Sequence, residues 1–217
     1  MMKPALEQLV HIPVDGAHIE GMLQLPANPQ GIVLFAHGSG SSRHSPRNNF
    51  VARELHAQHL GTLLLDLLTV GEDLDYQTRF DIPLLTHRLL VATRWVLQHA
   101  QTQRLPIGYF GASTGAAAAL QAAAAIPELI KAVVSRGGRP DLAGAHDLAR
   151  VAAPTLLLVG GHDPEVLELN QEALQRLPCT KDLVVVPGAT HLFEEPGTLE
   201  EVARLAAGWF SHHLRGV

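Results

Sequence analysis

The sequence predicts an α/β protein with a mostly parallel sheet of about eight strands and helices on both faces. Short aliphatic runs alternate with longer amphipathic stretches throughout the 217 residues, a pattern typical of repeated strand–helix units. Hydrophobic residues make up 47% and charged residues 17% of the chain, which excludes a disordered polymer. The length fits one domain, residues 1–217, built around a single core.

The first third of the chain predicts a hairpin followed by buried strands. Asp15-Gly16 is a hairpin turn signal between two extended runs. Residues 31–36 (GIVLFA) are continuously apolar, as expected of a central strand covered on both faces. Gly61 is expected just past the end of a helix. The predicted elements are strands 6–14, 18–25, 31–36 and 62–67 and a helix over 48–60.

The rest of the chain predicts four helices that alternate with strands. Asp81 can cap a helix whose apolar residues recur every three or four positions along one stripe. Thr198-Leu199-Glu200-Glu201 has the pattern of a capping box and opens the last helix. The expected strands are 107–110, 132–135, 155–159 and 183–186, and the expected helices are 81–100, 115–125, 166–177 and 198–212.

The strongest local signal is the pentapeptide GASTG at residues 111–115, which matches G-x-S-x-G. It lies between a predicted strand and an Ala-rich helix, the context of a nucleophile elbow. So tight a turn needs small residues at Gly111 and Gly115, and it lifts the Ser113 hydroxyl clear of the sheet edge. Serine is also a common helix N-cap, but the strand–turn–helix context favours Ser113 as a nucleophile.

A nucleophilic serine needs a base, and the base needs an acid that orients it. Asp163 and His191 follow the elbow in the chain order expected of this architecture. Each lies in a loop after a strand, at the sheet edge where ligands bind, so they are the candidate acid and base. The alternatives are a helix cap for Asp163 and an ordinary loop histidine for His191. Glu165 and Asp141 are competing acids, and Asp66 is expected to shape the pocket.

Acyl transfer also needs donors for the oxyanion of the tetrahedral intermediate. The backbone N–H groups of Thr114 and Ser39 are the candidates, the latter in the Gly-rich loop 37–42 (HGSGSS). The same loop resembles the start of a dinucleotide-binding G-x-G-x-x-G motif. Arg43 stands where the third glycine would be, which argues against nucleotide binding.

These motifs resemble the α/β-hydrolase superfamily and, within it, the dienelactone-hydrolase-like branch. The resemblance rests on HGSGSS at 37–42, GASTG at 111–115, GGHD at 160–163 and GATH at 188–191. It implies an eight-stranded sheet with an antiparallel second strand, and a Ser–Asp–His hydrolase. Dienelactone hydrolases carry cysteine at the elbow, whereas this chain has Ser113. A serine esterase acting on small carboxylic esters is therefore expected. The span 136–154 is too short for the cap domain often inserted there.

Substrate preference has one candidate determinant. Arg136 and Arg139 follow the sixth strand on the active-site side. Arg136 could hold a substrate carboxylate as a bidentate pair. The alternative is an internal salt bridge to Asp141 or Asp66. The loop 69–80 is expected to cover a pocket that is otherwise open.

Composition limits the partners and cofactors. A net charge of -5 with 16 Lys and Arg argues against a nucleic-acid surface, and no apolar run reaches the roughly 18 residues of a membrane span. The single cysteine, Cys179, excludes an internal disulfide and fits a reducing compartment. His56 and His59 lie three apart but lack a third ligand, so no metal is assigned and no cofactor is expected.

The sequence thus predicts a cytoplasmic enzyme with a small-molecule ester substrate, no nucleic-acid partner and no membrane association, and it leaves a homodimer open. Two other functions stay open at this point. One is acyl transfer to an acceptor other than water by the same three residues. The other is a non-catalytic binding protein on a hydrolase scaffold. Most of the 13 histidines have no explanation in the sequence.

Overall fold

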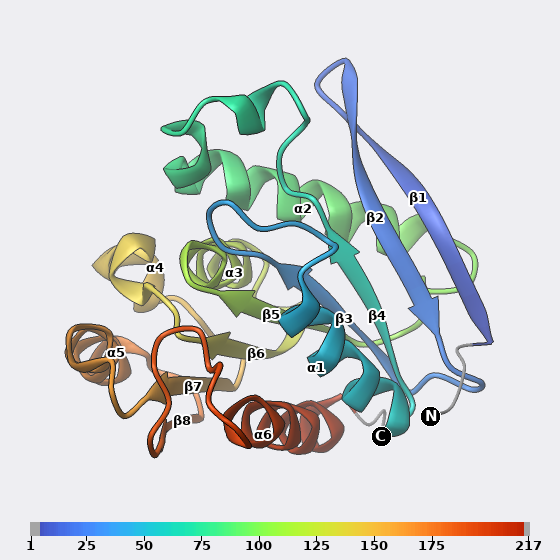
Figure 1. The fold of residues 1–217 in the computed structure, drawn as a ribbon. Coiled ribbons are helices and arrows are strands. Elements are labelled where there is room, and N and C mark those ends of the chain that lie inside the picture. The colour runs from blue at the N-terminus through green and yellow to red at the C-terminus, as the bar shows by residue number, and fades with distance from the viewer. Residues whose placement is uncertain (1–4, 215–217) are drawn as a thin grey trace.

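The computed structural model describes residues 5–214, which form one α/β unit (Figure 1). The strands are β1 (Leu6–Val14), β2 (Ala17–Leu25), β3 (Gly31–Ala36), β4 (Leu60–Leu65), β5 (Ile107–Ala112), β6 (Ile130–Arg136), β7 (Thr155–Gly160) and β8 (Lys181–Val186). The helices are α1 (Pro46–Ala57), α2 (Ile82–Gln98), α3 (Thr114–Ala125), α4 (Ala145–Leu148), α5 (Pro164–Arg176) and α6 (Thr198–His213). Short 3₁₀ helices are η1 (Glu72–Leu74), η2 (Thr78–Phe80) and η3 (Pro140–Ala143).

The described strands form a single sheet in the order β1-β2-β4-β3-β5-β6-β7-β8. Strand β2 pairs antiparallel with both β1 and β4, and the strands from β4 to β8 pair in parallel. The predicted fold class, a mostly parallel eight-stranded sheet with an antiparallel second strand, is confirmed. Parallel strands direct their carboxyl ends, and the loops that follow them, to one edge of the sheet.

Helices cover both faces of the sheet (Figure 1). Helices α1 and α6 pack on one face and α2 and α3 on the other. Strand β3 shows the resulting division, because Val33 and Phe35 face the α1/α6 layer while Ile32 and Leu34 face the α2/α3 layer. Successive side chains of a strand point to opposite faces, so a strand covered on both sides must be apolar throughout. This explains the continuous apolar runs in the sequence.

The boundary between α1 and β4 differs from the prediction of a helix over 48–60. The helix ends at Ala57, and Leu60 already belongs to the strand. The left-handed position that ends the helix is taken by His59, with φ 59°, rather than by Gly61. Gly61 serves packing instead, since a Cβ on it would lie 2.6 Å from Leu25 Cδ2 on the neighbouring strand.

The predicted capping box at the start of α6 is wrong. Gly197, with φ 83°, is the N-cap residue, and Thr198 is already the first helical residue. The Thr198 hydroxyl donates to the Glu195 carbonyl at 2.7 Å and therefore does not cap the helix. Glu200 and Glu201 still lie in the first turn, where their negative charge is favourable to the helix dipole.

Two connections border the carboxyl edge of the sheet. The β6–β7 connection contains only η3 and the single-turn α4, so the described chain has no cap domain there, as predicted. The β4–α2 connection carries η1 and η2 and projects beyond the sheet (upper left in Figure 1). Within residues 5–214 no helix combines the length and the apolar character needed to cross a bilayer.

Candidate active site

Ser113 occupies a strained turn between β5 and α3. Its backbone has φ 51° and ψ −122°, a region that residues with side chains rarely adopt. A Cβ on Gly111 would come within 2.8 Å of Ala116 N, and one on Gly115 within 2.5 Å of His37 O. Both approaches are to backbone atoms, which cannot move aside. The steric reason given for two glycines around Ser113 therefore holds in the structure.

Backbone hydrogen bonds join this turn to the end of β6 and the segment after it. Ser113 N donates to Arg136 O at 3.3 Å, and Ser113 O accepts from Arg139 N at 3.1 Å. On the other side, Gly38 of the β3–α1 loop lies so close that a Cβ there would be 3.0 Å from Ser113 Cβ. The loops after three strands thus meet around Ser113.

Asp163 and His191, the predicted acid and base, are hydrogen-bonded to each other. His191 Nδ1 lies 2.7 Å from Asp163 Oδ2, and 15% of the Asp163 side chain is exposed against 38% of the His191 side chain. Asp163 stands at the N-cap position of α5, but its side chain makes no capping hydrogen bond. Its carboxylate is therefore committed to His191. A carboxylate at Nδ1 leaves Nε2 as the nitrogen that can accept a proton.

Within residues 5–214 neither competing acid, Glu165 or Asp141, forms a hydrogen bond or ion pair with His191. Asp141 forms a bidentate pair with Arg139, at 2.9 and 2.7 Å. Asp66 accepts the Arg43 backbone N–H at 2.6 Å and pairs with its guanidinium. Asp66 thereby holds the β3–α1 loop in place, as expected of a residue that shapes the pocket.

The imidazole of His191 lies against the turn that follows β6. A Cβ on Gly137, whose φ is 50°, would be 3.5 Å from His191 Nδ1 and 3.1 Å from His191 O. Gly137 directly follows the residue whose carbonyl binds Ser113 N–H. Across residues 5–214 no hydrogen bond joins Ser113 Oγ to His191. Such bonds are often long in enzymes without substrate and tighten in the complex.

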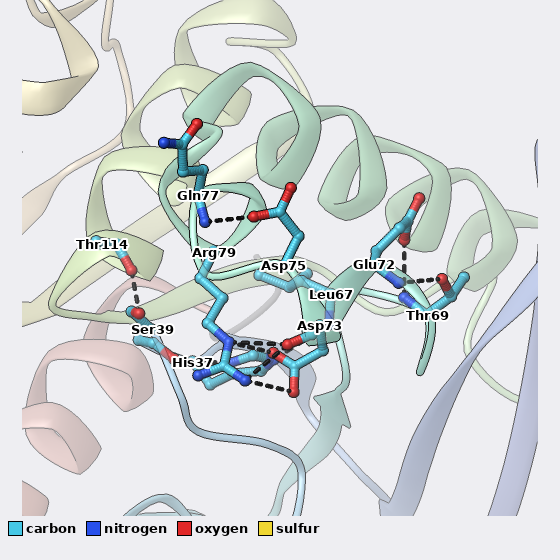
Figure 2. A network of polar contacts seen from close by, with 11 residues as sticks. His37, Ser39, Leu67, Thr69, Glu72, Asp73, Asp75, Gln77, Arg79 and Thr114 are labelled. Carbon is cyan, nitrogen blue, oxygen red and sulfur yellow. Dashed lines mark hydrogen bonds and ion pairs between the residues drawn. The ribbon is translucent and has the colours of Figure 1, made fainter.

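The two candidate oxyanion donors are adjacent but differ in their bonding. Thr114 is the first residue of α3, so its N–H has no acceptor within the helix. Ser39 N–H, however, donates to Thr114 Oγ1 at 3.0 Å (Figure 2). Ser39 N–H is thus already hydrogen-bonded in this structure, and its role as an oxyanion donor stays a prediction. The sequence predicts Thr114 only as a backbone donor, and the contact of its hydroxyl with this loop has no signal in the sequence.

His37 joins the loops after β3 and β4. Its Nε2 accepts the Leu67 N–H at 3.2 Å, and its Nδ1 lies 2.9 Å from Gly38 O. Nδ1 must therefore carry the proton, and the ring is neutral. Burial lowers the pKa of His37, which agrees with this bonding. His37 therefore ties the β3–α1 loop to the segment after β4.

The segment 69–80, named the rim segment below, borders a small cavity beside this loop. Within the rim segment Arg79 binds Asp73, with Arg79 Nε 3.0 Å from Asp73 O and 2.9 Å from Asp73 Oδ1 (Figure 2). The cavity is lined by residues 37–40, Leu68, Asp73, Arg79, Leu85 and Thr114. The apolar side chains of the rim segment are exposed, namely Val70, Leu74, Tyr76 and Phe80.

The two arginines after β6 have different environments. Arg139 makes the internal salt bridge to Asp141. Arg136 is buried with 7% exposure, and within residues 5–214 its guanidinium has neither a carboxylate nor a hydrogen-bond partner. It lies 5.7 Å from the Phe193 ring centroid. Burial, together with the nearby charge of Arg47, lowers the pKa of Arg136 to about 10.

The fold is that of an α/β hydrolase. A family model described as the alpha/beta hydrolase fold matches residues 31–153, and the chain belongs to this family. It is similar to a crystallised dienelactone hydrolase from Anabaena variabilis, with 54% identity and a TM-score of 0.95 over 99% of this chain and 100% of that one. Est1E from Butyrivibrio proteoclasticus shares the fold, with a TM-score of 0.82 and 16% identity over 96% of this chain and 99% of that one.

A curated relative carries a different name. A protein of Mycobacterium tuberculosis named "Putative phosphoribosyl transferase" is 55% identical over 213 residues, which are 98% of this chain and 48% of that protein. The chain therefore spans about half the length of the curated relatives it matches.

Proposed function

We propose that this chain is a serine hydrolase that cleaves small carboxylic esters through an acyl intermediate on Ser113. The observation that carries the proposal is the 2.7 Å contact between His191 Nδ1 and Asp163 Oδ2, made beside a serine on a strained elbow. A nucleophile, a base and an acid at one edge of the sheet, together with N–H donors for the oxyanion, are the groups that acyl transfer needs. The dienelactone hydrolase at 54% identity supports hydrolytic chemistry.

In the proposed mechanism, Ser113 Oγ attacks the ester carbonyl carbon while His191 Nε2 takes its proton. Asp163 holds the imidazole and stabilises its charged form. The N–H groups of Thr114 and Ser39 bind the oxyanion, the latter by sharing or releasing its bond to Thr114 Oγ1. His191 then protonates the leaving alkoxide, and water activated by the same nitrogen hydrolyses the acyl-enzyme. Loss of one oxyanion donor costs on the order of 10²–10³ in rate.

Hydrolysis of nitrophenyl esters tests this function. Ser113→Ala should lower kcat on the order of 10⁴-fold or more, and His191→Gln should do nearly the same. Cys179→Ala is the control, because this half-buried thiol lies between α5 and β8, away from the elbow, so that its loss should leave kcat unchanged. Wild-type turnover equal to that of Ser113→Ala would refute the proposal and favour a binding role. Product analysis with competing alcohols or amines separates hydrolysis from acyl transfer.

The name of the mycobacterial relatives is not carried over to this chain. It describes proteins about twice as long, and the half that matches aligns with nearly all of this chain, which has the hydrolase fold. Phosphoribosyl transfer therefore forms no part of the proposal.

We further propose that Arg136 binds a carboxylate on the acyl part of the substrate. A buried guanidinium without an acidic partner is unfavourable unless a bound anion supplies the negative charge. Arg136 directly precedes the turn against His191, and its carbonyl holds Ser113 N–H. An anionic group on the acyl part of the substrate would supply the partner that this guanidinium lacks.

Matched esters with and without a terminal carboxylate test the role of Arg136. Arg136→Met should lower kcat/KM for the acidic ester about 10- to 100-fold, the range of a charge-assisted hydrogen bond, and change the neutral ester little. Arg139→Met is the control, because Arg139 already has Asp141. Equal losses on both esters in Arg136→Met would show a structural role instead.

A further inference from the structure

The outer face of the β1–β2 hairpin carries a group of metal-ligating side chains away from the elbow. His11 and Glu20 are directly opposite each other in the antiparallel register, and His18 lies two residues before Glu20 on the same strand. Residues two apart on a strand share a face, so all three side chains stand on one side. His11 and His18 are exposed, and Glu20 is half-buried. We name these three residues the hairpin cluster.

The spacing within the hairpin cluster matches what a metal ion needs. His11 Nε2 lies 3.4 Å from Glu20 Oε1, and one ligand atom from each of the three residues lies within 4.8 Å of the others. Zinc binds nitrogen and oxygen at about 2.0–2.1 Å in a tetrahedron, which separates neighbouring ligand atoms by about 3.4 Å. One edge of the tetrahedron is thus already formed. The other ligand atoms lie up to 4.8 Å apart, so metal binding requires the exposed histidine side chains to rotate.

The second carboxylate oxygen of Glu20 is paired with Arg43. Arg43 lies 2.5 Å from Glu20 Oε2, which leaves Oε1 directed to the histidines. A ligating carboxylate whose other oxygen is hydrogen-bonded is the usual arrangement around protein metal sites. Arg43 also pairs with Asp66, so this support is part of a fixed network. An ordinary surface ion pair would need only His11 and Glu20 and would contribute little, whereas the hairpin cluster adds a second imidazole.

We propose that His11, His18 and Glu20 form a binding site for a divalent transition-metal ion, Zn²⁺ in particular, with water completing the coordination. Two imidazoles and one carboxylate suit zinc and are less suited to calcium or magnesium, which prefer oxygen ligands. The site is independent of the ester chemistry proposed above, because none of its residues belongs to that machinery.

Calorimetric titration of the untagged, chelator-treated full chain with ZnCl₂ tests the proposal. The expected result is saturable binding of one Zn²⁺ per chain at this site, with the affinity lowered at least tenfold in His11→Ala and in His18→Ala. His87→Ala is the matched control. His87 is a histidine 3.6 Å from an acidic oxygen, that of Asp15, but it lacks the second imidazole, so its variant should bind as wild type does.

Two further readouts separate a lost ligand from a lost fold. Zn²⁺ should raise the Tm of the wild type by mass action and should not raise it in the His11→Ala/His18→Ala double variant. Ester hydrolysis by the double variant should equal that of the wild type, which shows that the chain is folded. Absence of saturable Zn²⁺ binding in the wild type, or unchanged affinity in the double variant, would overturn the proposal.

Discussion

The nucleophile elbow and the rim segment border the same cavity but are held in place differently. Around the elbow, glycines approach backbone atoms so closely that no added carbon fits. In the rim segment, a Cβ on Gly71 would meet nothing within 4 Å, and Leu74 has 83% of its surface exposed. The nucleophile is therefore positioned by close packing, whereas its border is held by a few polar contacts. The elbow should therefore tolerate substitution less than the rim segment does.

The largest expected effect is a change at a single glycine of the elbow. Gly115→Ala should destabilise the chain by about 3 kcal/mol or more, because overpacking against backbone has no inexpensive relaxation. Gly71→Ala should stay within about 0.5 kcal/mol of the wild type, since Gly71 has an ordinary φ of −69°. Urea unfolding of both variants measures the contrast. Equal destabilisation would remove the distinction between the two regions.

The decrease in stability at low pH should come in part from a buried histidine of the packed core. His56 is buried on α1 and bonded to Thr62 of β4 at 2.8 Å, and burial lowers its pKa from 6.5 to about 4. Between these values the unfolded chain binds a proton that the folded chain does not. The contribution of His56 to the free energy of unfolding is therefore fully present above pH 6.5. It is lost as the pH drops toward 4, by about 3 kcal/mol.

Unfolding measured from pH 7 to pH 4 in the wild type and in His56→Gln tests this prediction. The variant should lose part of the slope, because it has no imidazole to protonate. A rim variant such as Leu74→Ser should keep the wild-type slope. Parallel curves for the wild type and His56→Gln would show that the acid sensitivity arises elsewhere.

The smallest expected effect concerns the polar contact that holds the rim segment. Arg79→Met removes the bonds to Asp73, and partly exposed ion pairs contribute about 1 kcal/mol or less. Global stability should change little, while limited proteolysis within residues 69–80 should become faster. Mass spectrometry of the fragments locates the cuts. An unchanged cleavage rate would mean that packing, rather than Arg79, holds the segment.

The fold was largely predictable from the sequence because its signals are local. Apolar runs, the elbow pentapeptide and the order of Ser113, Asp163 and His191 are all visible along the chain. The capping box at Thr198 failed because Gly197 can adopt a left-handed φ and takes the cap position. No local pattern distinguishes that outcome from a threonine cap.

Pairings between distant residues were less accessible. The bond from Ser39 N to Thr114 Oγ1 spans 75 positions. Asp141 pairs with Arg139 and not with Arg136, and this outcome depends on the directions of the side chains. The hairpin cluster did have a signal in the sequence. A two-residue turn at Asp15-Gly16 fixes the register and places His11 opposite Glu20.

Covalent labelling with a fluorophosphonate probe tests the central claim most directly. Such a probe reacts with a serine that an adjacent base activates. We predict one adduct per chain on the peptide that contains Ser113, none in Ser113→Ala, and much slower labelling in His191→Gln. A folded wild-type chain that stays unlabelled, or labelling that persists in Ser113→Ala, would contradict the account of Ser113 as the nucleophile.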